Sequence, residues 1–485
     1  MTQVAEERQI KFLTFNTWGL KYVSKHRKER LRAIADKLAD TSNNNGNNGN
    51  NNNSNFSSSS SKIIPLHDCI RNTAMGGIIE EDAYPEGEGL IDYDFDIIAL
   101  QEIWCKEDWD YLLERCSTKY PHSRLFYSGI LTGPGLAILS KIPIQSSFLY
   151  RFPINGRPSA FFRGDWYVGK SIAITKLKPI DANYPPIVVM NSHMHAPYAL
   201  TGDAAYECHR SVQAWDFSQL INLYKKAGYA VIVVGDLNSR PGSLPHNLLT
   251  QETGLVDSWE QLNGETNLFD LKRMNPLDQL KYGCTTCDSL LNTWRASRRP
   301  DEACRLDYAL IDSKRLKTLD AGVRFTDRIE NVGSFSDHFA YYCKLKVLPL
   351  HNNHNNINGR SDEEINGISN GRDLQLVRYS NYEALLKCID NYMITARKQK
   401  FYRGLHFLTS IFLSIACMVV TSFTSAKASW SSVFWVLFAV VVTVTGVIDG
   451  LISFLFGRNE IRALVEVQQE VQDSQRSLQE ILDNQ

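Results

Sequence analysis

A carboxylate and a carboxamide stand two residues apart in the stretch Tyr229–Pro241, which reads YAVIVVGDLNSRP. The apolar run Val231–Val234 predicts a strand buried on both faces. Alternate side chains of an extended chain share a face, so we expect Asp236 and Asn238 to project together while Leu237 turns inward. This gives a small polar pair at the rim of a sheet. The same residue types are common in caps and turns, so this stretch alone leaves both interpretations open.

Two histidines are also spaced two residues apart, in the segment NSHMHAPY that follows an apolar strand expected at 186–191. On an extended chain His193 and His195 face the same way, which is the geometry that a paired polar site would use. A single histidine is more often a surface or core residue. Two on one face at a strand end favour a functional role.

Acids and amides recur at the ends of other expected strands. Glu102 follows the strand 94–100, and Asp307 lies inside the strand 305–311, where a carboxylate costs free energy unless it has a partner. Each could be an ordinary solvated or salt-bridged acid, but the repetition indicates one shared site. The further members are Asn16 after the strand 12–15, and Asp337 and His338 before the last strand.

Two other patterns have plain alternatives. Cys284, Cys287 and Cys304 could begin a zinc site, but no fourth ligand stands at motif spacing, so ordinary thiols are favoured. The glycine-rich run 128–144 could cradle a phosphate or could form a turn before a strand, and it lacks the ending of a nucleotide-binding loop.

The elements that must position these residues indicate a layered α/β fold. Segment 27–40 places Leu31, Ile34, Ala35 and Leu38 on one face, as expected for an amphipathic helix lying on a sheet. Residues 41–61 are almost wholly Asn, Ser and Gly, which predicts a disordered insert.

Composition limits the partners and the compartment. The 485 residues contain 52 Lys and Arg against 53 Asp and Glu, and this balance argues weakly against a nucleic-acid partner. The N-terminal MTQVAEERQI lacks the apolar core of a secretory signal, so a cytosolic soluble part and free thiols at the ten cysteines are expected.

The C-terminal third reads as a membrane anchor. Segments 405–424 and 430–456 are each long and apolar enough to span a bilayer. Lys and Arg flank the pair, and only Lys427 lies between the spans, so both flanks are expected in the cytosol. Asp449, inside the second span, should reach the interface or a helix partner. The expected order is a linker at 349–375, a juxtamembrane amphipathic helix at 376–403, the two spans, and a cytosolic helical tail at 457–485.

The tail carries an apolar residue every seven positions, at Leu464, Val471 and Leu478. This spacing is compatible with a short coiled coil, and hence with self-association, or with a lone amphipathic helix.

Taken together, FNTWGL, LQEIW, NSHMHA, GDLNSRP, RLDYAL and SDHFA resemble motifs of the endonuclease/exonuclease/phosphatase superfamily, which includes deoxyribonuclease I. The match covers residues 10–348. The segments SGILTGPGLAILSK, RGDWYVGK and HMHA with HRSVQAW resemble the eukaryotic neutral sphingomyelinases that end in a membrane hairpin. The resemblance implies a four-layer α/β/β/α sandwich followed by two transmembrane helices.

The resemblance also implies roles for site residues. It makes Glu102 the direct Mg²⁺ ligand, with Asn16 close to the metal and Asp337 supporting the metal side of the pocket. His338 becomes the general base, held in its productive tautomer by Asp307.

The remaining roles concern the substrate. Asn238 would bind the phosphate, and His193 would stabilise charge on the phosphoryl oxygens. Asp236 could take the proton of the attacking water instead of His338, so both bases remain open. His195 is a supporting residue on the substrate side.

The expected activity is that of an Mg²⁺-dependent phospholipase C that hydrolyses membrane sphingomyelin to ceramide and phosphocholine. The alternatives are an inositol phosphosphingolipid as substrate, a membrane-tethered nuclease or phosphatase, and an inactive binding protein. An aromatic face should receive a choline headgroup, and Phe162, Trp166 and Tyr167 are the residues suggested for it.

Overall fold

The computed structural model describes residues 8–40, 62–71, 93–179, 181–350 and 363–484. They fall into two compact units. The sandwich unit contains Met1–Phe152, Tyr167–His195 and Trp215–Gly359, and the helical unit contains Pro153–Trp166, Ala196–Ala214 and Arg360–Gln485. The insert expected at 41–61 and residues 351–362 of the expected linker lie outside the described residues.

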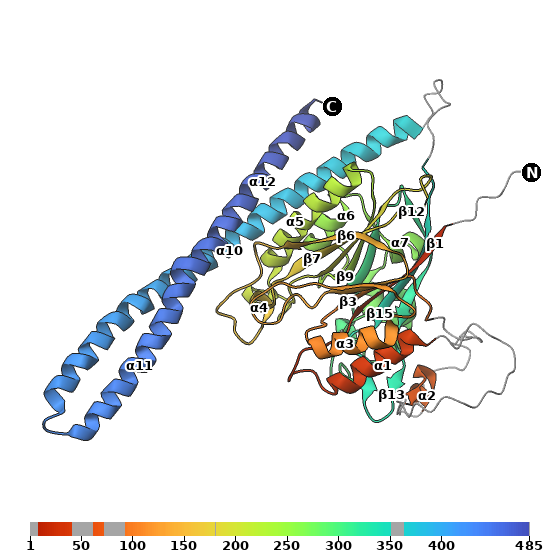
Figure 1. Ribbon diagram of the computed structural model, residues 1–485. Helices are drawn as coiled ribbons and strands as arrows, with labels where there is room; N and C mark the ends of the chain where they lie inside the picture. The colour runs from red at the N-terminus through yellow and green to blue at the C-terminus, as the bar shows by residue number, and fades with distance from the viewer. Residues whose placement is uncertain (1–7, 41–61, 72–92, 180, 351–362, 485) are drawn as a thin grey trace, which may run out of the picture. The chain divides into compact units, whose positions relative to one another are not determined.

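Two mixed six-stranded sheets form the centre of the sandwich unit (Figure 1). Their strand orders are β12-β15-β1-β3-β5-β4 and β10-β11-β9-β8-β7-β6. The pairs β1–β3 and β8–β9 are parallel, and the other neighbours in these sheets are antiparallel. The strands are β1 Gln9–Asn16, β3 Ile97–Gln101, β4 His122–Leu125, β5 Ala137–Ser140, β6 Ile144–Arg151, β7 Ser171–Leu177, β8 Ile187–His193, β9 Ala230–Asp236, β10 Val256–Asp257, β11 Asp307–Ile311, β12 Leu316–Arg324 and β15 Ala340–Val347. A small third sheet contains β2 Ile63–Ile64, β13 Arg328–Ile329 and β14 Gly333–Ser334.

Two apolar layers hold the sandwich together. One cluster lies between the sheets and joins Phe12 and Ala99 of the first sheet to Val189 and Ile232 of the second. Another packs the outer face of the first sheet against its covering helices, through residues such as Leu38 and Leu112. Strands buried on both faces explain the unbroken apolar runs of β3 and β9. The arrangement confirms the predicted four-layer α/β sandwich.

Most of the helices before residue 350 are short, and α1, α3 and α5 are the longer ones. Helix α1 begins where the amphipathic pattern predicts, and α3 packs beside it on the first sheet (Figure 1). The helices are α1 Arg27–Ala39, α2 Leu66–Arg71, α3 Lys106–Cys116, α4 Asp165–Val168, α5 Glu207–Lys226, α6 Leu244–Thr250, α7 Ser258–Asn263, α8 Leu268–Leu271 and α9 Pro276–Gly283, with 3-10 turns at Asp203–Ala205 and Pro300–Glu302.

The C-terminal region is more continuously helical than the sequence suggests. Helix α10, Glu363–Thr424, runs without a break through the end of the expected linker, the juxtamembrane segment and the first span. Helix α10 therefore begins inside the segment 349–375 that the sequence predicts as a linker. Helix α11 is Ser429–Leu451, a π-helical turn covers Ile452–Phe456, and α12 is Gly457–Asp483.

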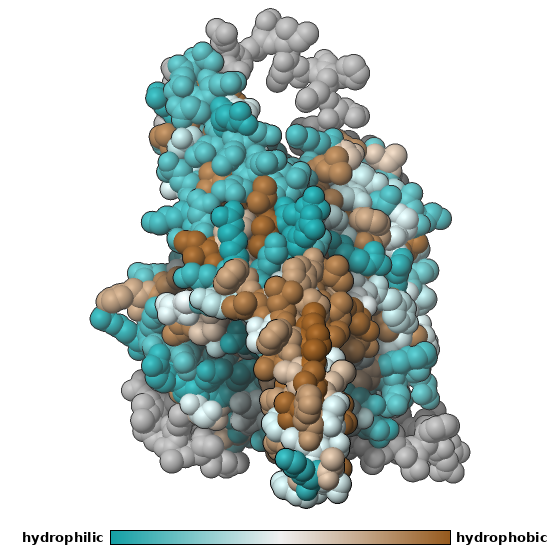
Figure 2. Space-filling model, turned by 90° about the vertical axis from the view of Figure 1, so that its left-hand side faces the viewer, coloured by the Kyte–Doolittle hydropathy of each residue, from teal (hydrophilic) through white to brown (hydrophobic). Residues whose placement is uncertain are grey.

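Among the described residues, two helices are long and apolar enough to cross a membrane. Large apolar side chains of α10 and α11 are exposed on the hairpin that they form, and Figure 2 shows this hairpin surface as mostly hydrophobic. A soluble protein rarely leaves so large an apolar surface uncovered. Two long apolar helices thus lie where the sequence predicts membrane spans.

Small and polar residues join the two arms of the hairpin. A Cβ atom added to Gly446 would lie 1.7 Å from Ser410 Oγ, and one added to Gly450 would lie 2.6 Å from the ring of Phe407. This G-x-x-x-G spacing lets the helices approach closely. Asp449 contacts Arg403, and its Oδ2 lies 2.8 Å from His406 Nδ1, so it has the predicted helix partner.

The heptad residues of α12 pack inside the same chain. Leu464, Val471 and Leu478 are buried, and α12 lies along α10, with Gln468 Nε2 donating to Asp390 Oδ1 at 2.8 Å. The residues of the predicted coiled-coil seam are thus buried within this chain, and self-association through α12 stays a prediction.

Candidate active site

Three polar residues stand in one row at the end of the second sheet. In the register of β8, β9 and β11, His193 lies opposite Asp236, and Asp236 lies opposite Asp307. His193 Nε2 is 3.5 Å from Asp236 Oδ2. Because strand order fixes this row, residues more than a hundred positions apart in sequence meet at one edge.

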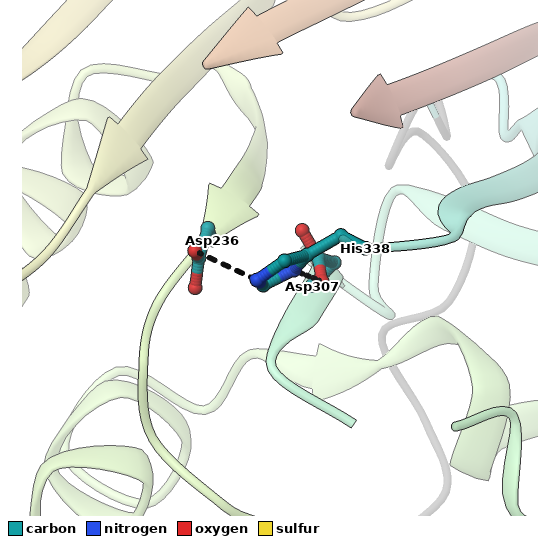
Figure 3. A group of neighbouring side chains, drawn as sticks. All are labelled: Asp236, Asp307 and His338. Carbon is teal, nitrogen blue, oxygen red and sulfur yellow. Dashed lines mark hydrogen bonds and ion pairs between the residues drawn. The ribbon is translucent and has the colours of Figure 1, made fainter. Parts of the chain in front are cut away.

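His338 completes the row from the loop before β15. Its Nδ1 is 2.8 Å from Asp307 Oδ2, and its Nε2 is 3.9 Å from Asp236 Oδ2. Figure 3 shows the imidazole between the two carboxylates. All three side chains are buried. The contact to Asp307 orients the ring so that Nε2 faces Asp236, as expected for a histidine that exchanges protons.

Asn16, at the end of β1, bridges two acids. Its Nδ2 donates to Glu102 Oε1 at 3.1 Å and to Asp236 Oδ2 at 2.9 Å, while its Oδ1 accepts from the backbone N–H of Trp18. The amide nitrogen of Asn16 thus holds the carboxylates of Glu102 and Asp236 on either side of it. The two sheets thereby contribute to one polar cluster.

Glu102 is held in an unusual backbone conformation by close neighbours. Its φ of 63° lies in the left-handed region, which is costly for a residue with a side chain. A Cβ on Gly19 would lie 2.1 Å from the carbonyl oxygen of Glu102, and one on Gly135 would meet the ring of Trp104 at 2.9 Å. Trp104 Nε1 donates to Glu102 Oε2 at 3.3 Å. The surrounding packing therefore fixes this carboxylate in place.

The pair at the end of β9 combines both of its predicted interpretations. Asp236 Oδ1 accepts from the backbone N–H of Asn238 at 3.0 Å, a turn contact, while Oδ2 belongs to the cluster. Asn238 has φ 48° and donates from Nδ2 to the carbonyl of Met194 at 3.0 Å. Leu237 is fully buried, as predicted.

Two predicted site residues lie at the margins of the cluster. His195 is buried beyond the end of β8. It is not one of the three side chains, Asp236, Asp307 and His338, whose ligand atoms are close enough to hold a metal ion. Asp337 Oδ2 pairs with Arg295 Nη2 at 2.5 Å, and its Oδ1 is 3.4 Å from Ser336 Oγ. Ser336 Oγ also donates to the backbone carbonyl of Asn16, which connects this segment to the centre of the site.

Burial and neighbouring charges raise the pKa values of two acids of the site and of its histidine. Burial and the nearby Asp337 raise the pKa of Glu102, against the lowering effect of Lys170. Burial raises the pKa of Asp236 to about 7, although His338 lowers it. Burial would lower the pKa of His338, but Cys287, Asp307 and Asp236 together raise it well above its ordinary value.

The donor set suits a hard divalent cation. Asp236, Asp307 and His338 form the one group of three or more such side chains, among the described residues, whose ligand atoms are close enough to hold a metal. Oxygen donors dominate once Glu102 is added, and Mg²⁺ prefers oxygen ligands and needs few carboxylates. Desolvated carboxyls with raised pKa values are those that a cation would stabilise in the charged form.

Two cationic side chains near the site, Lys170 and Arg295, were not singled out from the sequence. Lys170 is buried and lowers the pKa of both Glu102 and Asp236, so it acts on the cluster. Its segment, GDWYVGKS at 164–171, has the spacing of a phosphate-binding loop and could have signalled it, although strand β7 follows rather than a helix. Arg295 lies in a loop without periodicity and gave no such signal.

The glycine-rich run and the three clustered cysteines, for which the sequence left two interpretations, are both local structural features. The glycine run 128–144 leads into β5 and not into a helix, and Gly129, Gly133 and Gly135 all have positive φ. It is a turn that supports Glu102 through Gly135. Cys284, Cys287 and Cys304 are buried free thiols, and no metal-like group among the described residues includes a cysteine.

Comparison with known proteins agrees with this geometry. Residues 13–338 match the endonuclease/exonuclease/phosphatase family. The chain is 61% identical over 484 residues to the inositol phosphosphingolipids phospholipase C of Saccharomyces cerevisiae, covering 99% of this chain and 93% of the relative. For the protein of the same name in Schizosaccharomyces pombe, identity is 32% over 486 residues, with 97% and 95% covered. Human sphingomyelin phosphodiesterase 2 is 29% identical over 254 residues, 52% of this chain and 46% of that protein.

The chain therefore belongs to the endonuclease/exonuclease/phosphatase family. Within it, the chain falls in the group that joins these yeast phospholipases C to the neutral sphingomyelinases, with two long apolar helices at the C-terminal end. This confirms the resemblance drawn from the motifs.

Proposed function

We propose that the protein is a membrane-anchored, Mg²⁺-dependent phospholipase C that hydrolyses inositol phosphosphingolipids to ceramide and an inositol phosphate. The observation that carries the substrate class is 61% identity over almost the whole chain to an enzyme named for that activity. This reverses the order drawn from sequence, in which sphingomyelin came first. Sphingomyelin stays as the second candidate, because the shorter animal matches carry that name.

The site supports hydrolysis of a phosphodiester by water. His338, oriented by Asp307, lies with Nε2 toward Asp236, and one of these two groups takes the proton of the attacking water. The raised pKa of His338 favours its protonated form, and the pKa of about 7 at Asp236 suits a base near neutral pH. We therefore assign the proton acceptance to the Asp236–His338 pair as a unit.

The other residues act on the phosphate. Lys170 and His193 would offset charge that develops on the phosphoryl oxygens, and Asn238 would position the phosphate at the end of β9. Glu102 would hold Mg²⁺, with Asn16 and Asp337 beside it. When bound, Mg²⁺ would polarise a phosphoryl oxygen and offset its charge.

A direct substrate comparison tests this function. Full-length protein purified in detergent micelles is assayed with Mg²⁺ on inositol phosphoceramide and on sphingomyelin, and both products of each are identified. We expect a higher kcat/KM for inositol phosphoceramide, with release of ceramide. Turnover of sphingomyelin alone would overturn the substrate assignment, and inactivity on both lipids would overturn the proposed reaction.

We also propose that the hairpin spans a membrane with the sandwich and α12 in the cytosol and the turn at Lys427 on the other side. Arg397, Lys398 and Lys400 before the hairpin and Arg458 after it support this orientation. An Asn-X-Ser acceptor placed beside Lys427 should be glycosylated in microsomes. Glycosylation of the same acceptor placed after Asp483 instead would contradict it.

A further inference from the structure

A rigid segment carrying an arginine and a tryptophan is fixed beside the reacting histidine. Residues 292–295 are bound to residues 333–336, which lead directly into Asp337 and His338. Asn292 Nδ2 donates to the Ser336 carbonyl at 2.9 Å, and Trp294 Nε1 donates to the Ser334 carbonyl at 2.8 Å. Thr293 and Ser334 exchange two further hydrogen bonds, at 3.0 and 2.8 Å. Residues 292–295 are therefore held by the segment 333–336 that leads into His338, as a preorganised binding element requires.

Charged side chains of alternating sign line this segment. Arg295 Nη2 contacts Asp337 Oδ2 at 2.5 Å, and its Nε lies 3.6 Å from Asp288 Oδ1. Arg298 Nε lies 3.2 Å from the same Asp288 oxygen. The side chains of Asp288, Arg295 and Arg298 are 18%, 26% and 44% exposed. Donors and acceptors thus alternate from the buried site outward to solvent.

Trp294 of this segment contacts a second indole, that of Trp18. The rings of Trp18 and Trp294 are 5.4 Å apart, and both side chains are half-buried. The guanidinium of Arg30 lies 4.7 Å from the Trp18 ring and is fully buried, which holds that ring in place. Rigid indoles offer a flat apolar face at little entropic cost.

The chemistry of the substrate's three parts decides what this surface can receive. The phosphate belongs at the Asp236–His338 cluster, and an apolar ceramide chain would cover three partly exposed charged side chains without offering them any hydrogen bond. A trimethylammonium group needs aromatic faces but has no hydrogen-bond donors or acceptors to match the charged row. A cyclic polyol fits both features, because its hydroxyls pair with guanidinium and carboxylate groups and its C–H face packs on an indole.

We propose that Asp288, Arg295 and Arg298, with Trp18 and Trp294, form the subsite that binds an inositol-type polyol headgroup. This inference rests on the proposed function, since it places the headgroup of the same reaction. Arg298 and Asp288 contact the hydroxyls, and Arg295 connects this contact to Asp337 beside the reacting histidine.

The test measures selectivity with the full-length protein in mixed micelles. Arg298→Gln and Asp288→Asn should lower kcat/KM for inositol phosphoceramide relative to sphingomyelin by about tenfold each, the effect of one lost charge-assisted hydrogen bond, mainly through KM. Inhibition by free inositol 1-phosphate should weaken by a similar factor, while inhibition by phosphocholine should not. Arg299→Gln is the matched control, because Arg299 is 65% exposed and pairs with Asp301.

The outcomes separate the two proposals. A wild-type protein without activity on inositol phosphoceramide would overturn the proposed function and this subsite with it. A wild type that cleaves this lipid, with variants that lose activity equally on both lipids or retain full inhibition by inositol 1-phosphate, would overturn the subsite alone. Arg295→Lys is a second variant. It keeps a positive charge beside Asp337 but loses the planar guanidinium, and it should lower the ratio of kcat/KM for inositol phosphoceramide to that for sphingomyelin.

Discussion

Asp236 and Asp307 lie directly opposite each other on the antiparallel strands β9 and β11, with the imidazole of His338 reaching both carboxylates. Two buried carboxylates on one edge repel each other when both are charged, and a protonated imidazole between them offsets that cost. Protonation of Asp236 is therefore linked to that of His338.

Asp307→Asn should lower kcat by about a thousandfold or more, because an amide cannot hold the imidazole in the same tautomer. The melting temperature should stay within a few degrees of that of the wild type, since size and shape are kept. Asp320→Asn, at an exposed position on β12, is the control. A fully active Asp307→Asn protein would remove Asp307 from the mechanism.

Removal of divalent cations should abolish activity, and Mg²⁺ should restore it. Mg²⁺ at about a hundred times its Kd should stabilise the wild type by about 2.7 kcal/mol, measured as a rise in melting temperature. Glu102→Gln should lose this rise, whereas Glu107→Gln on the exposed first turn of α3 should keep it. A normal Mg²⁺-dependent rise in Glu102→Gln, with its loss in Asp236→Asn, would place the ion on the other carboxylates.

Gly19→Ala should reduce activity by at least about tenfold, because the added Cβ would lie 2.1 Å from the Glu102 carbonyl and displace the acid. We expect a destabilisation of about 1–3 kcal/mol from the overpacking. Gly322→Ala on β12 meets only the tip of Arg324 and serves as the control for kcat/KM and urea denaturation. Unchanged kinetics in Gly19→Ala would show that the loop accommodates the methyl group.

The sandwich should lose stability in acid through His246. Burial lowers the pKa of His246 to about 4, from 6.5 in the unfolded chain. Between these values the unfolded state binds a proton that the folded state does not, so stability falls as pH falls, by up to about 3 kcal/mol. Urea unfolding of His246→Gln and wild type from pH 7 to 4 should show a smaller loss in the variant. The partly exposed His122 gives the control, His122→Gln, and an equal slope in wild type and His246→Gln would contradict the assignment.

Gly446→Leu should separate the arms of the membrane hairpin. Ser414 Oγ and Thr443 Oγ1 are 2.7 Å apart, so cysteines at these two positions should cross-link readily under mild oxidation in detergent. Adding Gly446→Leu should reduce the cross-linked fraction several-fold, whereas Val444→Leu, at an exposed position, should not. Undiminished cross-linking would show that α10 and α11 do not depend on this close approach.

Much of the fold followed from local patterns. The buried runs of β3 and β9 and the amphipathic face of α1 carry their signals in consecutive residues. Repeated acids and amides at strand ends indicated one shared site, but the contacts that join Asp236, Asp307 and His338 depend on strand pairing, which is not visible in spacing. The position of Arg295 depends on hydrogen bonds to a segment about forty residues away, and no periodic pattern marks it.

One continuous helix runs through the juxtamembrane segment 376–403 and the first apolar segment 405–424 that the sequence distinguishes. The change from charged to apolar residues alters the surroundings of a helix but does not interrupt its backbone. Gly404 packs against Ser453 of the π-helical turn, and the helix continues through it.

Helix α10 has 62 residues, which gives a length of roughly 93 Å. About twenty residues are enough to cross the hydrocarbon of a bilayer. In the proposed topology the rest of α10 would lie outside the lipid as part of the same unbroken helix, so the orientation of the hairpin in a bilayer would set the direction of this outer segment.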